Sequence, residues 1–466
     1  MTSNSNIQDT VDTASNVFER LDGMSYQSRA HLLRAIGDRL NVHGDKIVEI
    51  ASRETSLDRV RIQGELIRTV SQITIYADAL ERRFANDQSI NASEGSVGRA
   101  SIFRTFSGIG PVANFEASNF PLAFGALGTD TVSALAAGCP VIVKIHPAHP
   151  GTSELCVRIA NEVFIDESLE GAVTFVHGDA QVSADLVQAD QIAAVTFTGS
   201  QSVGRILLDL AARRAKPIPV FAEMGSLNPI IITQGMFSNR DSPELASTIA
   251  SSVCSSAGQL CTKPGLIFVP HGRDGDRFST DLQKAIGATG PFSFIDDRIK
   301  SRFISRMAEV EAIGNVKVLL GSDPDRAWLY EVVLNSQETA DFQAVFCQEM
   351  FGPATVIVRY GDFGQVSQVL NRIGGQLVIS FYALNGEISA ISTLIKVAMR
   401  NAGRIVWCGV PTGVAVVEGM HHGGPWPASS ASIGSVGPEA ITRFLRPVTW
   451  QGFPNEALPQ VFRLQS

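Results

Sequence analysis

The sequence lacks any long block of like charge, any internal repeat and any low-complexity linker. Its Lys and Arg residues are dispersed and its net charge is −8, so the composition gives no support to a nucleic-acid or anionic-membrane role. Without a linker, we expect the domains to pack against each other rather than to be joined by a flexible segment. An anionic cofactor or substrate would be held by local groups and not by the field of the whole protein.

Cysteine is scarce, and the six residues lack the spacing of metal ligands or of a disulfide scaffold. This usage fits the reducing cytosol. The first ten residues are polar and lack the apolar core of a signal peptide. The small apolar stretch 123–145 holds Asp130, Gly138 and Pro140, which favours a helix, a stop and a buried strand over a membrane span. We therefore expect a cytoplasmic protein without a metal site.

What the sequence does contain is a regular alternation of helix and strand patterns. At 466 residues it is too long for one core, which predicts two or three domains. Residues 11–87 carry apolar residues at three- and four-residue spacing and are predicted to be helical. Strands and helices alternate from 109 to 235 and again from 226 to 432, as in doubly wound parallel sheets. The expected helices include 122–137, 152–163, 201–214 and 243–257, and the expected strands include 101–106, 141–145, 172–176, 193–197 and 218–222.

Cys261 is the first candidate for chemistry. A predicted helix ends near Gly258, and Cys261 follows in the loop before a strand. A thiol held between two rigid elements can project into a cleft, where backbone N–H groups can lower its pKa and bind a developing oxyanion. A lone cysteine is more often a small buried hydrophobe, so this position alone does not decide its role.

Glu223 is the second candidate. It directly follows an apolar strand and precedes a glycine turn, and active sites of α/β proteins form at such carboxyl ends of strands. Desolvation there would raise its pKa toward the value of a general base. The alternative is a solvated loop carboxylate.

Two further blocks stand at helix starts. Asn119 precedes a helix whose first turn holds Pro121, and it is either a helix cap or an amide donor for an oxyanion. Residues 195–204 combine a strand, the turn Gly199-Ser200 and a helix start, where free N–H groups can bind phosphate. This block is not a G-x-G-x-x-G sequence and is weak evidence by itself.

Taken in order, these four blocks resemble the aldehyde dehydrogenase superfamily. Residues 348–353 add to the resemblance, since the family carries Glu-x-Phe-Gly-Pro there, and the likeness spans about residues 10 to 455. Residues 146–154 and 422–428 resemble the branch of 2-oxoglutarate semialdehyde (2,5-dioxopentanoate) dehydrogenases and a bacterial NADP-dependent fatty aldehyde dehydrogenase. The tail 446–454 resembles the former more.

The resemblance implies an α/β fold with two doubly wound parallel-sheet domains and a small β arm for oligomerisation. Residues 1–88 and 109–225 would form the dinucleotide-binding domain and residues 226–432 the catalytic domain. Residues 89–108 and 433–466 would form the arm and tail, whose sheet edge needs a partner. A homodimer or homotetramer is expected.

By the same resemblance, Cys261 is the nucleophile, and the Asn119 amide with the Cys261 backbone N–H holds the oxyanion. Glu223 activates the water that hydrolyses the thioester. The implied cofactor contacts are Lys144, His149, Gly199, Ser200, Gly204, Glu349 and Phe351. Pro147 stands where NAD-preferring relatives carry a Glu that meets the ribose, so NADP is the first choice of cofactor and NAD the second.

Several readings of the function stay open at this point. The first is oxidation of 2,5-dioxopentanoate to 2-oxoglutarate, with Lys263 or Arg104 as the cation for an anionic substrate. Medium- or long-chain fatty aldehydes are the second substrate class, and a CoA-acylating relative is a further possibility. A non-catalytic binding protein on the same fold is motivated by Glu116, which replaces a usual Gly, and by a short segment between Cys261 and Glu349.

Overall fold

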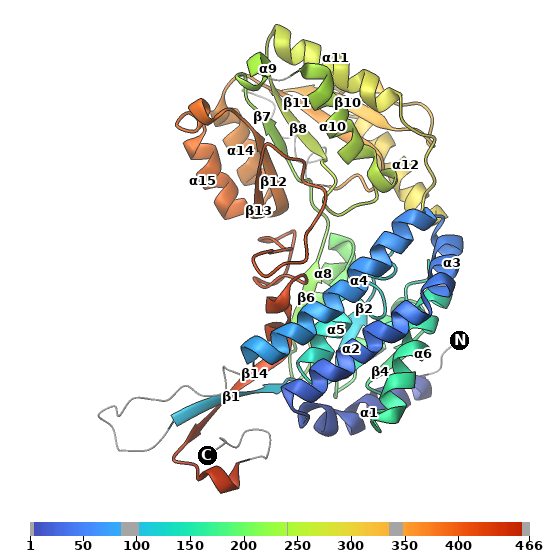
Figure 1. Ribbon diagram of the computed structural model, residues 1–466. Helices are drawn as coiled ribbons and strands as arrows, with labels where there is room; N and C mark the ends of the chain where they lie inside the picture. Colours follow the sequence, from blue (N-terminus) through green and yellow to red (C-terminus); the bar gives the residue numbers. More distant parts are fainter. Residues whose placement is uncertain (1–3, 85–101, 240, 335–347, 459–466) are drawn as a thin grey trace.

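The computed structural model describes residues 4–84, 102–239, 241–334 and 348–458 (Figure 1). It begins with four helices, and the side chains of Ser25 and Asp58 cap two of them by accepting backbone N–H bonds. These helices are α1 (Asn4–Asp22), α2 (Tyr26–Val42), α3 (Gly44–Thr55) and α4 (Arg59–Ala79), followed by a π-helical turn at Leu80–Phe84. The predicted helical character of 11–87 is confirmed as far as residue 84.

The first sheet has five parallel strands in the order β4-β3-β2-β5-β6. The strands are β2 (Val112–Phe115), β3 (Val141–Lys144), β4 (Val173–Val176), β5 (Ala194–Thr198) and β6 (Val220–Glu223). Helices α5 (Thr129–Ala136), α6 (Pro150–Asp166), α7 (Ala180–Gln188) and α8 (Gln201–Ala212) connect them. The chain moves outward from β2 to β4 and returns to β5 on the other side. The carboxyl ends of β2 and β5 therefore flank the crevice where such sheets bind ligands.

The second sheet has seven strands in the order β13-β12-β7-β8-β11-β10-β9, and only β9 runs antiparallel to its neighbour among the described strands. The strands are β7 (Ile230–Ile232), β8 (Leu266–Pro270), β9 (Lys317–Leu320), β10 (Trp328–Val333), β11 (Ala354–Tyr360), β12 (Gln376–Tyr382) and β13 (Ala402–Trp407). Its helices are α9 (Met236–Asn239), α10 (Ser242–Cys254), α11 (Arg273–Gly287), α12 (Asp297–Glu311), α14 (Phe363–Ile373) and α15 (Ser392–Asn401). The predicted fold class is confirmed.

Both sheets are covered on both faces. In β3, Val141 and Val143 pack into one core cluster while Ile142 packs into the cluster on the opposite face. In β11, Val356 packs into one core cluster and Ile357 packs into the cluster on the opposite face. Successive side chains of a strand point to opposite faces, so a strand buried on both sides is apolar at every position. This is why these strands appear in the sequence as uninterrupted apolar runs.

Two predicted helices are shorter than expected. The helix predicted over 122–137 begins only at Thr129, because the chain turns tightly before it. A Cβ on Gly125 would lie 1.9 Å from the carbonyl oxygen of Pro121, so the backbone at Gly125 lies directly against the backbone at Pro121. The helix predicted over 243–257 ends at Cys254. Within the described residues, none of the helices has the length and apolar character needed to cross a bilayer.

The arm is a two-stranded antiparallel ribbon that projects from the first unit (Figure 1). It pairs β1 (Ile102–Gly108) with β14 (Leu445–Gln451). Residues 89–101 of the predicted arm, and 459–466 of the predicted tail, lie outside the described residues.

Residues 420–444, here called the return segment, come back from the second unit to the first. The backbone N–H of Met224 donates to the carbonyl of Ala428 at 2.8 Å, beside β6. Farther along, Ala440, Ile441 and Phe444 join the core of the first unit. Residues 433–444 were predicted as part of the arm and tail, and most of them are buried against the first unit.

Candidate active site

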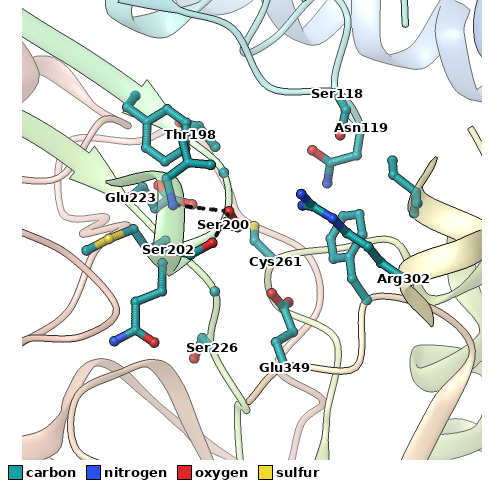
Figure 2. Close-up of a pocket in the computed structure, with 18 of the residues that line it drawn as sticks. Ser118, Asn119, Thr198, Ser200, Ser202, Glu223, Ser226, Cys261, Arg302 and Glu349 are labelled. Atoms are coloured by element: carbon teal, nitrogen blue, oxygen red, sulfur yellow. Dashed lines mark hydrogen bonds between the residues drawn. The ribbon is translucent and has the colours of Figure 1, made fainter. Parts of the chain in front are cut away.

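A cavity of about 900 Å³ lies at the carboxyl ends of the strands, with walls from both units. Figure 2 shows the Cys261 sulfur in this cavity between Asn119 and Glu349, and Ser200 lines the same cavity. The predicted site residues that line it are Asn119, Lys144, Gly199, Ser200, Glu223, Cys261, Glu349 and Phe351. Fold topology thus brings together residues from six separate stretches of sequence.

The Cys261 loop is held rigidly. A 3₁₀ turn at Ser255–Gly258 precedes it, and the two residues before Gly258 have φ of 51° and 55°. Gly258 itself has φ 65°, and a Cβ there would lie 2.1 Å from the carbonyl oxygen of Gly352. After the turn, Asn228 Nδ2 donates to the Cys261 carbonyl at 2.8 Å. The thiol is therefore presented by a backbone that has little freedom to move.

Cys261, His422 and Glu223 form one cluster. The Cys261 Sγ lies 3.7 Å from His422 Nε2, which in turn lies 2.9 Å from Oε1 of Glu223. The hydroxyl of Ser435 donates to the other carboxylate oxygen, Oε2, at 3.0 Å. Glu223 and His422 are 5% and 4% exposed, so the cluster is shielded from bulk water. An imidazole and a carboxylate beside a thiol can accept its proton.

The pKa of Glu223 is lowered, whereas the sequence led us to expect a raised value. Burial alone raises the pKa, but the contacts with His422, Ser435 and Cys261 together lower it by more. The carboxylate is therefore ionised in the resting site, as a proton acceptor must be.

The pKa of Cys261 is raised well above its usual value, also against expectation. Burial is the largest cause, and the charges of Glu223 and Glu349 add to it. Backbone N–H groups do not outweigh these effects. The resting group is a thiol, so the reaction requires a base close to the sulfur.

Asn119 is positioned as an amide donor. Its side-chain Nδ2 donates to the backbone carbonyl of Gln259 at 2.9 Å, and its backbone carbonyl accepts from the Arg61 guanidinium at 2.6 Å. The Asn119 side chain is 6% exposed and lines the cavity. Because an amide nitrogen carries two hydrogens, one N–H remains for an oxyanion beside Cys261.

The other end of the cavity has the features of a dinucleotide site. Ser200 caps α8 by accepting from the backbone N–H of Val203 at 3.4 Å, and the helix start faces the cavity. At Gly199 a Cβ would lie 2.5 Å from the Phe197 ring, so only glycine leaves this turn unobstructed. A buried oxygen of Glu349, Oε1, has no hydrogen-bond partner among the described residues. Free N–H groups suit phosphate, and an unpaired carboxylate oxygen suits a sugar hydroxyl.

Glu349 and Lys263 are both buried, and each charge affects the pKa of the other group. Burial raises the pKa of Glu349 to about 8, although Lys263 opposes the shift. Burial lowers the pKa of Lys263 to about 8, with Glu349 opposing. Lys263 Nζ donates to the carbonyl of Ala354 at 2.6 Å and is 1% exposed. Lys263 therefore braces the second sheet and is not available to an anionic substrate, and Arg104 lies in β1 on the arm.

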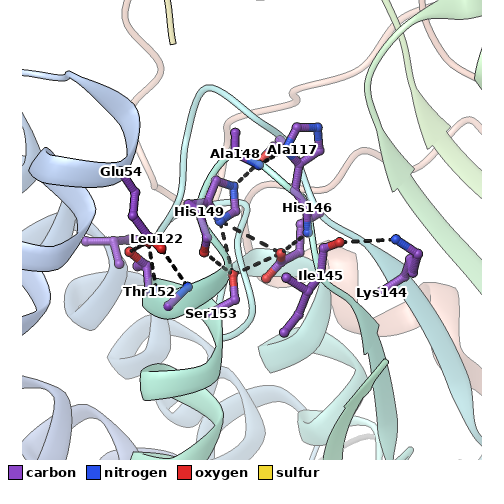
Figure 3. Close-up of polar contacts among 12 residues, drawn as sticks. Glu54, Ala117, Leu122, Lys144, Ile145, His146, Ala148, His149, Thr152 and Ser153 are labelled. Carbon is purple, nitrogen blue, oxygen red and sulfur yellow. Dashed lines mark hydrogen bonds and ion pairs between the residues drawn. The ribbon is translucent and has the colours of Figure 1, made fainter. Parts of the chain in front are cut away.

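His149 is not in the cavity wall, which corrects its predicted cofactor contact. The ring is fully buried, with Nε2 2.8 Å from the carbonyl of Ala117 and Nδ1 3.0 Å from Ser153 Oγ (Figure 3). Ser153 also donates to Glu116. His149 thus holds the loop after β3 against Ala117 and Ser153, on the side away from the cavity, while Lys144 lines the cavity.

Gly204 also serves packing. A Cβ there would lie 2.6 Å from the Met224 sulfur, so glycine permits α8 to approach the end of β6. It is absent from the described wall of the cavity.

Sequence reasoning missed three residues of the site: His422, Ser435 and Arg68. His422 precedes a Gly-Gly-Pro stretch that had been used only for the family resemblance. Arg68, on α4, is electrostatically coupled to Cys261 and Glu223, and burial lowers its pKa. No local pattern marks a helical arginine as facing a site 193 positions away (261 − 68).

Comparisons with known proteins agree with this geometry. The pattern described as the aldehyde dehydrogenase family matches residues 1–448. Alpha-ketoglutaric semialdehyde dehydrogenase 2 of Azospirillum brasilense is 36% identical, over 97% of this chain and 88% of its own length. The alpha-ketoglutaric semialdehyde dehydrogenase of Acinetobacter baylyi is 33% identical, over 98% and 88%.

Solved structures share the fold. A bifunctional proline utilization A protein superposes with a TM-score of 0.82 at 23% identity, covering 96% of this chain. The match spans 45% of that longer chain. At this identity the likeness concerns the fold alone.

Proposed function

This chain belongs to the aldehyde dehydrogenase family, and we propose that it oxidises 2,5-dioxopentanoate to 2-oxoglutarate. Family membership makes it an NAD(P)-dependent oxidoreductase. The observation that carries the proposed chemistry is the Cys261–His422–Glu223 cluster at one end of the cavity. The substrate rests on the two relatives with that activity in their names.

The first step is attack by Cys261. Its thiol proton passes to the His422–Glu223 pair, and the sulfur bonds to the aldehyde carbon to give a thiohemiacetal. The free N–H of Asn119 and the backbone N–H of Cys261 stabilise the oxygen as it becomes negative. These donors are in place before the reaction, so no reorganisation is needed when charge develops.

Bound NAD(P)⁺ supplies the hydride acceptor that converts the hemiacetal carbon to a thioester. The residues that would hold it are Lys144 at the adenosine ribose, Ser200 and the α8 start at the pyrophosphate, and Glu349 with Phe351 at the nicotinamide ribose. Glu223 then takes a proton from water, which attacks the thioester carbon. The C–S bond breaks, the acid leaves and Cys261 regains its proton.

For the cofactor, NADP⁺ is our first choice and NAD⁺ the second. Pro147 lines the cavity three residues after Lys144, so no carboxylate at that position repels a 2′-phosphate. Glu116 also lines the cavity and its charge interacts with that of Lys144, and one of its carboxylate oxygens accepts from the His146 N–H at 2.8 Å. A homodimer or homotetramer built on the arm, and a cytoplasmic location, are parts of the same proposal.

An aldehyde panel assayed with each cofactor tests this function. We expect kcat/KM for 2,5-dioxopentanoate to exceed that for a long-chain aldehyde by about 10- to 100-fold, the value of one charge-assisted contact. The readout is NADPH or NADH absorbance, with the acid identified by chromatography. Turnover of only the long-chain aldehyde would contradict the substrate, and a CoA ester formed on adding CoA would contradict hydrolysis.

Arg68 is the cation we assign to the carboxylate of this substrate. Its charge interacts with those of Glu65, Cys261 and Glu223, and its Nε is buried without a hydrogen-bond partner among the described residues. A guanidinium group whose charge reaches the nucleophile suits an anionic aldehyde, because a carboxylate accepts charge-assisted hydrogen bonds.

Arg68→Ala should therefore raise the KM for 2,5-dioxopentanoate by about 10- to 100-fold, through loss of that bond. The KM for hexanal, which has no carboxylate, should change little. Steady-state kinetics on both aldehydes measures the difference. Equal losses on the two substrates would mean that Arg68 supports the fold rather than the substrate.

A further inference from the structure

We propose that Cys261, His422 and Glu223 form a binding site for Zn²⁺, and that a bound ion reversibly switches the enzyme off. The three residues come from separate parts of the chain, so sequence spacing gave no sign of a metal site. Their donor atoms, a sulfur, an imidazole nitrogen and a carboxylate oxygen, all lie within 4.8 Å of one another. This goes beyond the proposed function, and it concerns a ligand that is neither substrate nor cofactor.

The distances are close to those of a tetrahedral ion. With Zn–S near 2.3 Å and Zn–N near 2.0 Å, tetrahedral geometry places sulfur and nitrogen about 3.5 Å apart. The Cys261 Sγ and His422 Nε2 are 3.7 Å apart. Nitrogen and oxygen ligands would be about 3.4 Å apart, whereas His422 Nε2 and Glu223 Oε1 are 2.9 Å apart. The sulfur and the carboxylate oxygen lie within 4.8 Å, so an ion requires Glu223 to withdraw from His422 by about half an ångström while it keeps within reach of the sulfur.

That oxygen is poised to accept a metal. Glu223 Oε1 is buried, and its one close polar contact among the described residues is His422 Nε2 at 2.9 Å, whose proton the ion would replace. The other oxygen, Oε2, accepts the Ser435 hydroxyl at 3.0 Å. A hydrogen bond to one oxygen fixes the carboxylate so that the second points at the ion, as partners of metal ligands do in established sites.

Charge balance also favours the ion. Binding releases the Cys261 proton to solvent, so one Zn²⁺, one thiolate and one carboxylate sum to zero net charge. A neutral assembly is what a site shielded from water tolerates best. The positive charge of Arg68 opposes binding, and Glu349, whose pKa burial raises to about 8, favours it where its carboxyl is ionised; both act on Cys261. Cys261 and Glu223 line the cavity, which leaves the fourth position to water.

Occupation would stop the reaction at its first step. The ion uses the lone pair of the sulfur that attacks the aldehyde, and it also uses the carboxylate that activates water. Metal and aldehyde therefore exclude each other. A thiolate bound to zinc is also withheld from alkylating reagents.

Direct binding to the cofactor-free protein tests the proposal. After treatment with a chelator, the protein is titrated with Zn²⁺ against a chromophoric competitor, and with Co²⁺ to detect thiolate-to-metal charge transfer. We expect one high-affinity Zn²⁺ per chain. Cys261→Ala and His422→Gln should each weaken binding by at least about 100-fold, since even outer partners of metal ligands contribute 10- to 100-fold.

Matched variants provide the controls. His421→Gln changes the neighbouring histidine and Cys408→Ala changes another half-buried cysteine, and both should bind Zn²⁺ as the parent does. Melting curves of the metal-free variants identify any that fail to fold. Zn²⁺ should also protect Cys261 from iodoacetamide, and chelation should restore labelling.

Two results would overturn the proposal: absence of stoichiometric binding, or unchanged affinity in folded Cys261→Ala and His422→Gln proteins. Neither measurement needs an aldehyde. Zinc binding in a protein that oxidises no aldehyde would reject the proposed function alone, and an active enzyme without zinc binding would reject only the metal site.

Discussion

Cys261→Ala is expected to lower kcat/KM for the aldehyde by at least about 10⁴-fold, because removing a nucleophile removes the covalent route entirely. No other described cysteine can replace it. Cys139, Cys156 and Cys254 are buried, and burial raises their thiol pKa values. The half-buried Cys408 directly follows β13 and is not among the described residues that line the cavity.

NADPH formation with saturating aldehyde measures this effect. The affinity for NADP⁺, followed by protein fluorescence, should stay within about threefold of the parent, because the substitution removes no predicted cofactor contact. Cys408→Ala is the matched control and should retain full activity. Residual turnover above one per cent in the Cys261→Ala protein would show that another group is the nucleophile.

Glu223→Gln is expected to lower steady-state kcat by about 10²- to 10⁴-fold, the usual contribution of a general base. The amide keeps the shape of the carboxylate and can still accept from Ser435, but it cannot take a proton from water. Acylation of Cys261 can continue with His422 as the base, whereas hydrolysis of the thioester cannot. Rapid mixing should therefore reveal a burst of about one NADPH per site, followed by a slow phase.

The shape of the time course separates two roles of this carboxylate. A slow first turnover without a burst would mean that Glu223 acts mainly on the Cys261 thiol, contrary to the hydrolytic role. Ser435→Ala removes the hydroxyl that orients Oε2 and serves as a milder comparison. It should reduce kcat by about 10-fold, as expected for one hydrogen bond, without a burst.

The elements that carry chemistry could be predicted because they obey local rules. β3 and β6 are buried on both faces, so Val141–Lys144 and Val220–Glu223 are recognisable as apolar runs that end in a charged residue. The carboxyl ends of parallel strands meet at one edge of the sheet. Glu223 was predicted at this edge from its position at the end of a strand, whereas Lys144 was named only through the family resemblance, and both line the cavity.

Electrostatic environment could not be predicted in the same way. The expected pKa shifts of Glu223 and Cys261 had the wrong sign. Burial is the largest cause of the raised pKa of Cys261, and the lowered pKa of Glu223 depends on His422 and Ser435, which are far away in the sequence. His422 reaches Glu223 across 199 positions (422 − 223), on a segment with no regular structure of its own. His149 failed for a related reason. It was predicted as a cofactor contact, but its ring is buried, with Nε2 facing the Ala117 carbonyl and Nδ1 facing Ser153.

The return segment has a consequence for how the protein matures during synthesis. A nascent chain that has emerged only as far as β13 already contains the nucleophile, the amide donor and the predicted water-activating carboxylate. It still lacks His422 and Ser435, and the first unit still lacks Ala440, Ile441 and Phe444 from its interior. The cluster around Cys261 is therefore complete only after residues 422–435 have been synthesised and have packed beside the first sheet.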